Sequence, residues 1–341
     1  MSASEPLTLE LEAGTRSVTA RAAIAGLGSA LPAQVVPNAS IASVIGVDDE
    51  WIERRTGIRS RRRVGAGDSL VGLAVASARA ALADAGLDGG ELDLVLLATI
   101  SQESSMPNLA PQVASGIGAH HAGAFDVGAA CSGFLMGLAT GASFIEAGRA
   151  RNVLVVGAEV LSRQTDPHDR RTAALFGDGA GAVVLGRADG GGGCGGCGGG
   201  ISAIELGCDG TLSQLIVTDP DSGLIRMDGH ETFKQAVACM ERASRAICAN
   251  AGVDLSDEVE LFVFHQANAR ITRALTERLG VAEAKVIDCI AELGNTSSAT
   301  VPLALEHARA DGRLRAGSRV LVCTVGSGFI WGAMLLEWGR G

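Results

Sequence analysis

A unit made of a tight turn, an apolar helix and an apolar strand occurs twice along this chain of 341 residues. In the first copy, small residues at 128–133 lead into a segment with helical apolar spacing and then into a strand at 151–156. In the second copy, a turn at 294–299 leads to an apolar helix and to a strand at 319–324. Such a repeat predicts a duplicated α/β architecture with helices layered on mixed sheets. The two turns would then face each other near a pseudo-twofold axis.

Further elements are predicted around the two copies. The strand expected at 260–264 resembles the one at 93–97, since both have an acidic start and an apolar run. An alanine-rich helix is expected over 69–86. Glycines at alternate positions of 176–182 predict a tight turn with close backbone packing, followed by a strand at 183–185.

Composition narrows the class of protein. Hydrophobic residues make up 47% of the chain and aromatic residues only 3%, which predicts a large aliphatic core. Lysine and arginine total 28 and aspartate and glutamate total 38, so the net charge of −10 argues against a general nucleic-acid binder. No apolar run approaches the roughly 18 residues that a membrane-spanning helix needs, and the acidic N-terminal segment does not resemble a secretory signal. The eight cysteines show no disulfide framework, which favours a soluble protein of the reducing cytoplasm.

The chain is predicted to divide into two halves joined by a linker. The linker is almost entirely glycine, a composition typical of a flexible surface connection. Cys194 and Cys197 within it have no second cysteine pair or nearby histidines, so they predict no zinc site. The expected organisation is a flexible tail at 1–20, an N-terminal half at 21–189 with a nucleophilic cysteine, the glycine-rich linker at 190–200, and a C-terminal half at 201–341 with a histidine and an asparagine.

Cys131 is the first candidate for chemistry. It follows a short apolar run at 124–127 and comes just before the helix of the first copy. Unpaired backbone N–H groups and the positive end of the helix dipole favour a thiolate at such a position. The alternative is an inert buried cysteine, because free cysteine is among the most buried residue types.

His265 and Asn295 are the partners that the second half offers. His265 ends the strand expected at 260–264, where sheets of this kind open their ligand crevice. A core imidazole satisfied by a backbone group is the alternative. With Cys131, the two residues supply a nucleophile, a tunable imidazole and an amide donor, a set that suits acyl transfer. A cysteine-protease triad uses the same residue types, but the duplicated architecture does not favour it.

Six arginines lie between positions 54 and 63, next to Trp51, in a chain that is acidic elsewhere. An aromatic side chain beside guanidinium groups suits a ligand with a flat base and phosphates, or an acidic partner protein. The alternative is a solvated charged face.

The order and spacing of these motifs resemble a known family. The chain resembles the thiolase-fold condensing enzymes, and within them β-ketoacyl-acyl-carrier-protein synthase III. The resemblance implies a thiolase-like fold of two duplicated α/β halves in an α-β-α-β-α arrangement. The segments that carry it are WIERRTGIR at 51–59, DVGAACSGF at 126–134, FGDGAG at 176–181, HQANAR at 265–270, GNTS at 294–297 and GSGFIWG at 326–332.

The resemblance also implies how the reaction is divided among the residues. Cys131 would be acylated by an acyl-CoA primer, with its own backbone N–H and that of Ser327 as the oxyanion hole. His265 and Asn295 would bind the carbonyl of a malonyl thioester while decarboxylation generates the attacking carbanion. Asn268 would support His265.

Binding residues follow from the same resemblance. Trp51 and Arg170 would flank the adenine of CoA. Arg55 and Arg270 would contact the phosphopantetheine or the acidic acyl carrier protein. Asn268 would be a further residue of this CoA- and carrier-binding site. The implied acyl pocket contains Met106, Phe176 and Met227. No metal or other cofactor is implied, since acyl-CoA and malonyl-acyl carrier protein are substrates, and a homodimer is expected.

Two positions depart from the family's usual residues. Met106 stands where phenylalanine is frequent, at a loop that closes the acyl pocket across the dimer. A flexible thioether there predicts turnover of longer or branched primers. Ser327 replaces a frequent glycine, but the implied role belongs to its backbone amide.

Several related functions stay open at this point. The nearest is a starter-unit ketosynthase, or an acyltransferase of the same family, in a polyketide or natural-product pathway. A biosynthetic thiolase would need a second cysteine where Ser327 stands, and elongating ketosynthases have a second histidine in place of Asn295. A non-catalytic scaffold is disfavoured because all three reactive groups are present, and a cysteine hydrolase is disfavoured further.

Overall fold

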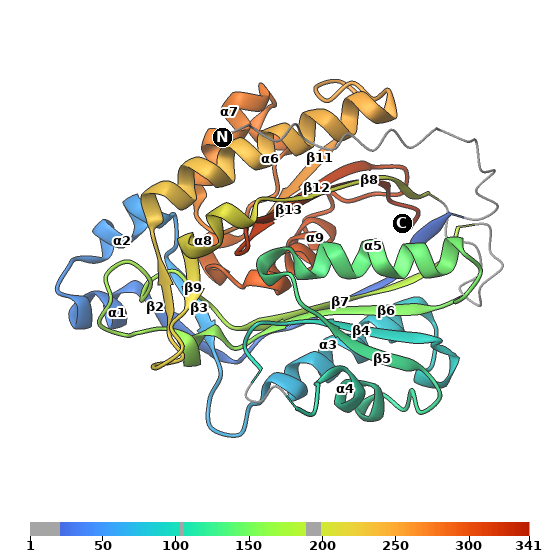
Figure 1. Cartoon of the computed structure of the whole chain (residues 1–341), viewed down its shortest axis with the longest axis horizontal. Coiled ribbons are helices and arrows are strands. Elements are labelled where there is room, and N and C mark those ends of the chain that lie inside the picture. The colour runs from blue at the N-terminus through green and yellow to red at the C-terminus, as the bar shows by residue number, and fades with distance from the viewer. Residues whose placement is uncertain (1–20, 103–105, 189–198, 341) are drawn as a thin grey trace, which may run out of the picture.

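The computed structural model describes residues 21–102, 106–188 and 199–340, which form five stacked layers (Figure 1). Two mixed β-sheets alternate with three layers of helices. The tail predicted at 1–20 and nearly all of the glycine-rich linker, including Cys194 and Cys197, lie outside the described residues. None of the helices in the described ranges combines the length and apolar character needed to cross a bilayer.

The first sheet has the strand order β1-β7-β6-β4-β5. The strand β4 is parallel to its two neighbours β5 and β6, while β7 is antiparallel to both β6 and β1. Its strands are β1 (Ala22–Ala30), β4 (Leu94–Ala98), β5 (Gly123–Val127), β6 (Val153–Glu159) and β7 (Gly179–Arg187).

The second sheet repeats this arrangement without a counterpart of β5. Its order is β11-β12-β13-β8, with β11 parallel to β12 and the other two pairs antiparallel. The equivalent strands are therefore β4 and β11, β6 and β12, β7 and β13, and β1 and β8. This order confirms the predicted duplication of an α/β unit. The strands are β8 (Gly200–Cys208), β11 (Leu261–Phe264), β12 (Arg319–Gly326) and β13 (Ile330–Glu337).

Helices cover both sheets and fill the space between them (Figure 1). The central layer contains α5 (Gly133–Glu146) and α9 (Thr300–Ala310). One outer layer contains α3 (Leu70–Ala85) and α4 (Ala110–Gly116), and the other contains α6 (Gly229–Ala251) and α7 (Ala269–Leu279). The predicted helix at 69–86 is confirmed, because the Ser69 side chain caps its first turn and Gly86 ends it in the left-handed conformation.

Three apolar cores lie between these layers, and aliphatic side chains dominate them. The central core joins Phe134 and Leu138 of α5 to the inner faces of both sheets. A second core packs the alanine-rich face of α3 on the first sheet, and a third packs α6 and α7 on the second sheet. Burial on both faces explains why the strands are continuous apolar runs rather than alternating ones.

One prediction about local structure is wrong. The glycine turn was expected to end before a strand at 183–185, but β7 already begins at Gly179. Gly181 lies in the strand because the central helix α9 crosses it closely: a Cβ at Gly181 would be only 2.7 Å from Pro302. The glycines thus serve close packing between layers rather than a turn.

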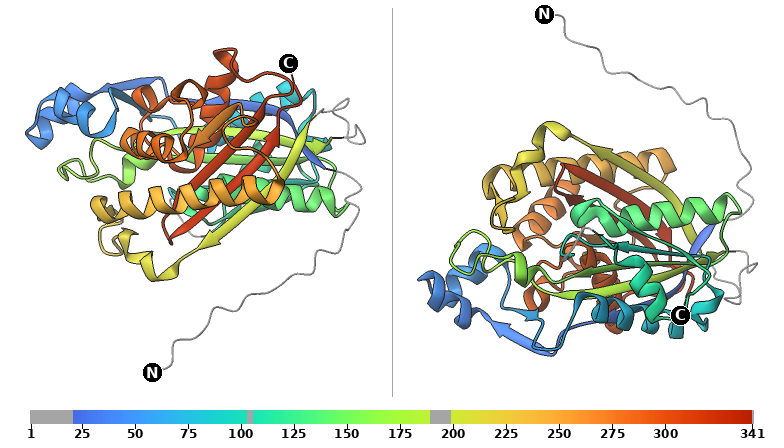
Figure 2. Two further views of the ribbon diagram at one scale, coloured as in Figure 1. Left: turned by 90° about the horizontal axis from the view of Figure 1, so that it is seen from above. Right: turned by 60° about the horizontal axis from the view of Figure 1, so that its bottom comes forward.

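The remaining elements gather at one end of the layers. The helices α1 (Asn38–Ile45) and α2 (Asp49–Thr56) project there (Figure 2), next to the paired strands β2 (Gln34–Pro37) and β3 (Ser60–Arg63). A two-stranded ribbon of β9 (Ile216–Thr218) and β10 (Ile225–Met227) and the short helix α8 (Ile290–Leu293) complete the set.

Candidate active site

Cys131 lies on a tight turn between β5 and the central helix α5. A single turn of 3-10 helix, Ala130–Ser132, connects the two, and its first residue has a φ of +46°, which non-glycine residues seldom adopt. The turn at Ser297–Ala299 before α9 repeats this geometry, since Ser297 has a φ of +48°. Duplication therefore extends to the backbone conformation of the two turns, which contact each other as predicted.

The end of β12 fixes the Cys131 turn from the other half of the molecule. A Cβ at Gly326 would lie 2.9 Å from the backbone nitrogen of Cys131 and 3.1 Å from the carbonyl oxygen of Ala129. Only glycine allows this approach without displacement of the turn. Ser327, the next residue, lines the same cavity as Cys131, so the structure brings together the two residues whose backbone N–H groups were predicted to form an oxyanion hole.

Burial raises the pKa of the Cys131 thiol to about 11. The hydroxyl of Ser297 acts in the opposite direction, but its effect is smaller than that of burial. The expectation that the helix N-terminus favours a thiolate is therefore wrong, because removal of the sulfur from water outweighs the hydrogen bonds that would stabilise the thiolate.

His265 follows β11 and is buried. Its backbone N–H donates to the carbonyl of Cys323 at 2.8 Å, and this bond extends the parallel pairing of β11 with β12. Burial lowers the pKa of the imidazole to about 4, so the ring is neutral at physiological pH. Its Nδ1 has no hydrogen-bond partner among the described residues. The alternative of a core histidine satisfied by a backbone partner through Nδ1 is thus not observed.

Asn295 lies between α8 and the 3-10 turn at Ser297–Ala299. Its backbone N–H donates to Leu175 at 2.8 Å and its carbonyl accepts from Gly177 at 3.0 Å, which ties it to the first half. The side-chain Oδ1 accepts a 2.8 Å hydrogen bond from the backbone N–H of Ser297. This bond fixes the orientation of the amide and leaves its Nδ2 free to donate to another group.

Cys131, His265 and Asn295 line one cavity of about 180 Å³. Its other walls are mainly apolar, and they come from the β9–β10 ribbon, α6 and the end of β12. The predicted acyl-pocket residues Phe176 and Met227 line this cavity. They also line a wider cavity of about 840 Å³. Residues such as Ile216 and Ile225 were missed by the sequence analysis, because short ribbon strands carry little periodic signal.

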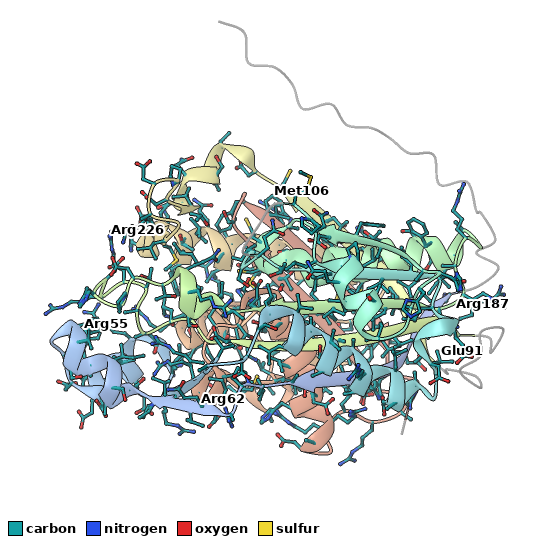
Figure 3. All side chains as sticks on the ribbon, turned by 90° about the horizontal axis from the view of Figure 1, so that it is seen from below. Arg55, Arg62, Glu91, Met106, Arg187 and Arg226 are labelled. Atoms are coloured by element: carbon teal, nitrogen blue, oxygen red, sulfur yellow. The ribbon has the colours of Figure 1, made fainter. Side chains whose placement is uncertain are left out.

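Met106 does not line either cavity, and its side chain is 83% exposed. It lies apart from Arg55 and Arg226, which are at the end of the molecule where α1 and α2 project (Figure 3). Because the prediction places Met106 at an acyl pocket across a dimer, the structure of one chain does not test it, and it stays a prediction.

The wider cavity contains the predicted binding residues. Trp51, Arg55, Arg170, Asn268 and Arg270 all line it. The guanidinium of Arg55 lies 4.4 Å from the ring centre of Trp51, a cation–π contact, and Arg170 Nε donates to the Ile45 carbonyl at 2.7 Å. The sequence analysis missed further residues of this wall, among them Arg226, His230 and Phe233.

The arginine cluster at 54–63 does not form one binding surface. Only Arg55 of the six lines the wider cavity. Arg54 pairs with Glu50, and Arg59 pairs with Glu292 on the surface. Arg61 is fully buried and donates to two backbone carbonyls and to Asn38, so its role is structural.

Asn268 also differs from expectation. Its Oδ1 accepts from the backbone N–H of Arg270 at 2.9 Å and so caps α7. Its Nδ2 donates to the carbonyl of Arg55 at 3.1 Å. Within the described residues its side chain makes no hydrogen bond to His265, so Asn268 joins α2 to α7 rather than supporting the imidazole.

A duplicated five-layered α/β fold, with a cysteine on a tight turn that shares a cavity with a histidine and an asparagine, defines a thiolase-like condensing enzyme. Profiles described as 3-oxoacyl-(acyl-carrier-protein) synthase III and its C-terminal part match residues 125–210 and 248–338. The chain belongs to the 3-oxoacyl-(acyl-carrier-protein) synthase III family.

Relatives of known name agree with this assignment along nearly the whole chain. The chain is 43% identical over 323 residues to beta-ketoacyl-(acyl-carrier-protein) synthase III 2 of Streptomyces coelicolor, covering 95% of this chain and 96% of that protein. It is 42% identical over 324 residues to beta-ketoacyl-(acyl-carrier-protein) synthase III of Mesorhizobium japonicum, covering 93% of this chain and 99% of that protein.

Solved structures are similar over the same extent. The structure of 3-oxoacyl-(acyl-carrier-protein) synthase III from Aquifex aeolicus has a TM-score of 0.88 and 41% identity, covering 93% of this chain and 100% of that one. The priming beta-ketosynthase from the R1128 polyketide biosynthetic pathway has a TM-score of 0.87 and 36% identity, covering 94% of this chain and 97% of that one.

Proposed function

We propose that this protein is an acyltransferase that condenses an acyl-CoA primer with malonyl-acyl carrier protein, with loss of carbon dioxide, to give a β-ketoacyl-acyl carrier protein at the start of fatty-acid synthesis. The observation that carries the proposal is the convergence of Cys131, His265 and Asn295 on one apolar cavity in a member of this family. The names of the curated relatives favour this reaction over the priming of a natural-product pathway.

In the first half-reaction, Cys131 takes the acyl group from the primer. The sulfur–acyl bond forms while the acyl–sulfur bond of acyl-CoA breaks, and the thiol proton leaves with CoA as its free thiol. Because burial holds Cys131 protonated, attack and proton loss belong to the same step. The backbone N–H groups of Cys131 and Ser327 stabilise the oxyanion of the tetrahedral intermediate.

In the second half-reaction, the malonyl thioester loses carbon dioxide and becomes a nucleophile. Negative charge then develops on its thioester carbonyl oxygen, where neutral His265 and the Nδ2 of Asn295 donate hydrogen bonds. A neutral imidazole suits this task, since its lowered pKa keeps it a donor that carries no charge of its own. The carbanion attacks the acyl-cysteine, and the Cys131 thiolate that leaves takes a proton from solvent.

The wider cavity provides the route for both thioesters. Trp51 offers an aromatic face for the adenine, with Arg170 beside it, while Arg55 and Arg270 provide positive charge for phosphates. These guanidinium groups would form a positive region in a chain whose net charge is −10. They would steer acyl-CoA and an acidic carrier protein to this end of the molecule.

Assembly and location belong to the same proposal. The strand β5 is at the edge of the first sheet, and Phe125 within it is 39% exposed. An unpaired apolar edge favours pairing with a second copy, so we expect a homodimer through β5. Met106 would then contribute to the partner subunit's acyl pocket. The functional halves are 21–189 and 201–341, and the enzyme acts in the cytoplasm on its two thioester substrates without a metal or other cofactor.

Intact-mass spectrometry tests the proposal. The protein is incubated with a panel of acyl-CoAs, and then with malonyl-acyl carrier protein. We expect an acyl adduct on Cys131 that persists in water and is released with carbon dioxide only when the malonyl thioester is added. Cys131→Ala is the control, since the exposed thiol of Cys208 could also be acylated. Rapid hydrolysis of the adduct, or its absence with every primer, would contradict the proposal.

A further inference from the structure

Glu159 is a buried acidic residue that the proposed reaction does not use. It ends β6 and is fully buried. Among the described residues no cation pairs with it. A buried carboxylate without a cation is costly, so the protonation state of this group needs an explanation.

One carboxyl oxygen, Oε2, is surrounded by donors from the end of β4. The backbone N–H of Ile100 donates to it at 3.1 Å, and the hydroxyl of Ser101 lies 2.7 Å away. Ser101 Oγ accepts the backbone N–H of Val160 at 2.8 Å, so its own hydrogen is available for Oε2. Oε2 therefore acts as an acceptor.

The other oxygen, Oε1, accepts the backbone N–H of Ser298 at 3.4 Å. A second contact requires Oε1 to donate as well. Oε1 lies 2.8 Å from Ser298 Oγ, which lies 2.8 Å from the carbonyl oxygen of Ala98 as well. A hydroxyl has one hydrogen, and a carbonyl can only accept. Ser298 thus donates to Ala98, and the short contact with Glu159 requires a hydrogen on Oε1. Burial raises the pKa of Glu159, in agreement with a neutral carboxylic acid.

The residue that this acid holds belongs to the Asn295 turn. Ser298 follows Ser297, whose backbone N–H donates to the Oδ1 of Asn295. The same turn is pressed on β6 at Gly157, where a Cβ would lie 2.4 Å from the carbonyl oxygen of Ser298. The end of β6 therefore fixes the turn at two points, one by contact and one by a hydrogen bond.

We propose that Glu159 is a neutral carboxylic acid that positions the Asn295 turn from the opposite half of the molecule. Through Ser298 it sets where the Nδ2 of Asn295 points in the cavity. Glu159 is a positioning residue, since it acts through Asn295 and touches no substrate. In its effect on catalysis this inference rests on the proposed function, and it predicts that Glu159 matters for malonyl decarboxylation and much less for acylation of Cys131.

The two half-reactions separate this role from a general loss of structure. Acylation of Cys131 is followed by intact mass, and carbon dioxide release from malonyl-acyl carrier protein is followed on enzyme acylated in advance. In Glu159→Leu we expect release of carbon dioxide to slow by about 10- to 100-fold, less than the loss of a complete transition-state donor, because Asn295 is displaced but present. Acylation should stay within about threefold of the parent. An equal loss in both half-reactions would overturn the proposal.

Glu159→Gln tests the protonation state. An amide NH₂ can donate to Ser298 as the acid does, and the amide oxygen can accept from Ser101 and Ile100, so both half-reactions should stay within about threefold of the parent. Loss of decarboxylation in this variant, as severe as in Glu159→Leu, would mean that an ionised carboxylate is required. Glu146→Gln, at the end of α5 and away from both cavities, is the matched control.

A spectroscopic measurement keeps the inference testable if the leucine variant does not fold or if the protein catalyses another reaction. The infrared difference spectrum between the parent protein and Glu159→Gln at neutral pH should contain the C=O band of a protonated carboxylic acid. A carboxylate band in its place would overturn the assignment. Absence of any Cys131 adduct in the parent protein would instead contradict the proposed function and leave this spectrum as the test of Glu159.

Discussion

The hydroxyl of Ser327 donates a 2.6 Å hydrogen bond to the backbone carbonyl of Ile216. The bond connects the residue after β12, whose N–H we assign to the oxyanion hole, with the first residue of β9. Ile216 and Met227 of the β9–β10 ribbon line the cavity that contains Cys131. Ser327 thus ties the wall of the cavity to the segment that contacts the Cys131 turn.

Removal of this hydroxyl should change the choice of primer. In Ser327→Ala the ribbon loses one tether, and a net hydrogen bond of about 0.5–1.5 kcal/mol corresponds to a roughly twofold to tenfold change. We expect kcat/KM to fall by this factor for the preferred primer and to fall less for longer ones, measured as acylation rates across acyl-CoAs of increasing length. Ser327→Thr keeps the hydroxyl and should restore the profile. An unchanged ratio between primers in the alanine variant would argue against the tether.

Alkylation of Cys131 should speed up steeply with pH. Its pKa of about 11 means that each pH unit between 7 and 9.5 increases the thiolate fraction, and hence the rate with iodoacetamide, by about tenfold. Peptide mapping separates Cys131 from Cys208, which is exposed. A plateau in the Cys131 rate at or below pH 8 would show that the helix N-terminus dominates over burial after all.

Apolar periodicity and repeated spacing were sufficient to predict the architecture. The strand at 260–264 and the helix at 69–86 are recognisable because each is apolar and bounded by polar or glycine residues. The duplicated turns also identified Cys131 and Asn295, because a duplication brings its equivalent turns together, and His265 was identified by its position at the end of an apolar strand. These signals are either local or repeated along the chain, so they can be recognised in a single sequence.

Properties that depend on tertiary burial could not be predicted in this way. Arg61 looks like any other arginine of its cluster, and only the packing of β2 and the segment at Ala174 around it makes it structural. The raised pKa of Cys131 has the same origin, since the atoms that exclude water come from both halves. Glu159 carried a signal that was overlooked: an acidic residue at the end of a continuous apolar strand.

Folding stability should decrease as the pH falls through the range in which His265 is protonated in the unfolded chain but neutral in the folded protein. The imidazole takes up a proton below about pH 6.5 in the unfolded chain, but only below about 4 in the folded protein. Between these two pH values the unfolded state binds more protons than the folded state. The free energy of unfolding therefore decreases as the pH decreases across this window. The full effect is on the order of 3 kcal/mol.

Urea unfolding of the parent and of His265→Gln at pH 7 and pH 4.5 measures this effect, and the variant should lose less stability than the parent. Equal losses in both proteins would assign the slope to other groups.

Two arginines only six positions apart should give opposite phenotypes. Arg61→Ala removes the donor for the carbonyls of Val36 and Ala174 and for Asn38, and leaves these buried acceptors unpaired. We expect a loss of unfolding free energy of about 3 kcal/mol or more, by urea denaturation.

Arg55→Ala removes an exposed guanidinium from the wall of the wider cavity, so stability should change by less than about 1 kcal/mol. Its KM for acyl-CoA and for malonyl-acyl carrier protein should instead rise, with a larger rise at low ionic strength, because screening by salt weakens the charge that it contributes. If Arg61→Ala were as stable as the parent while its KM values rose, Arg61 would belong to the binding surface, and the division of the cluster into structural and binding residues would be wrong.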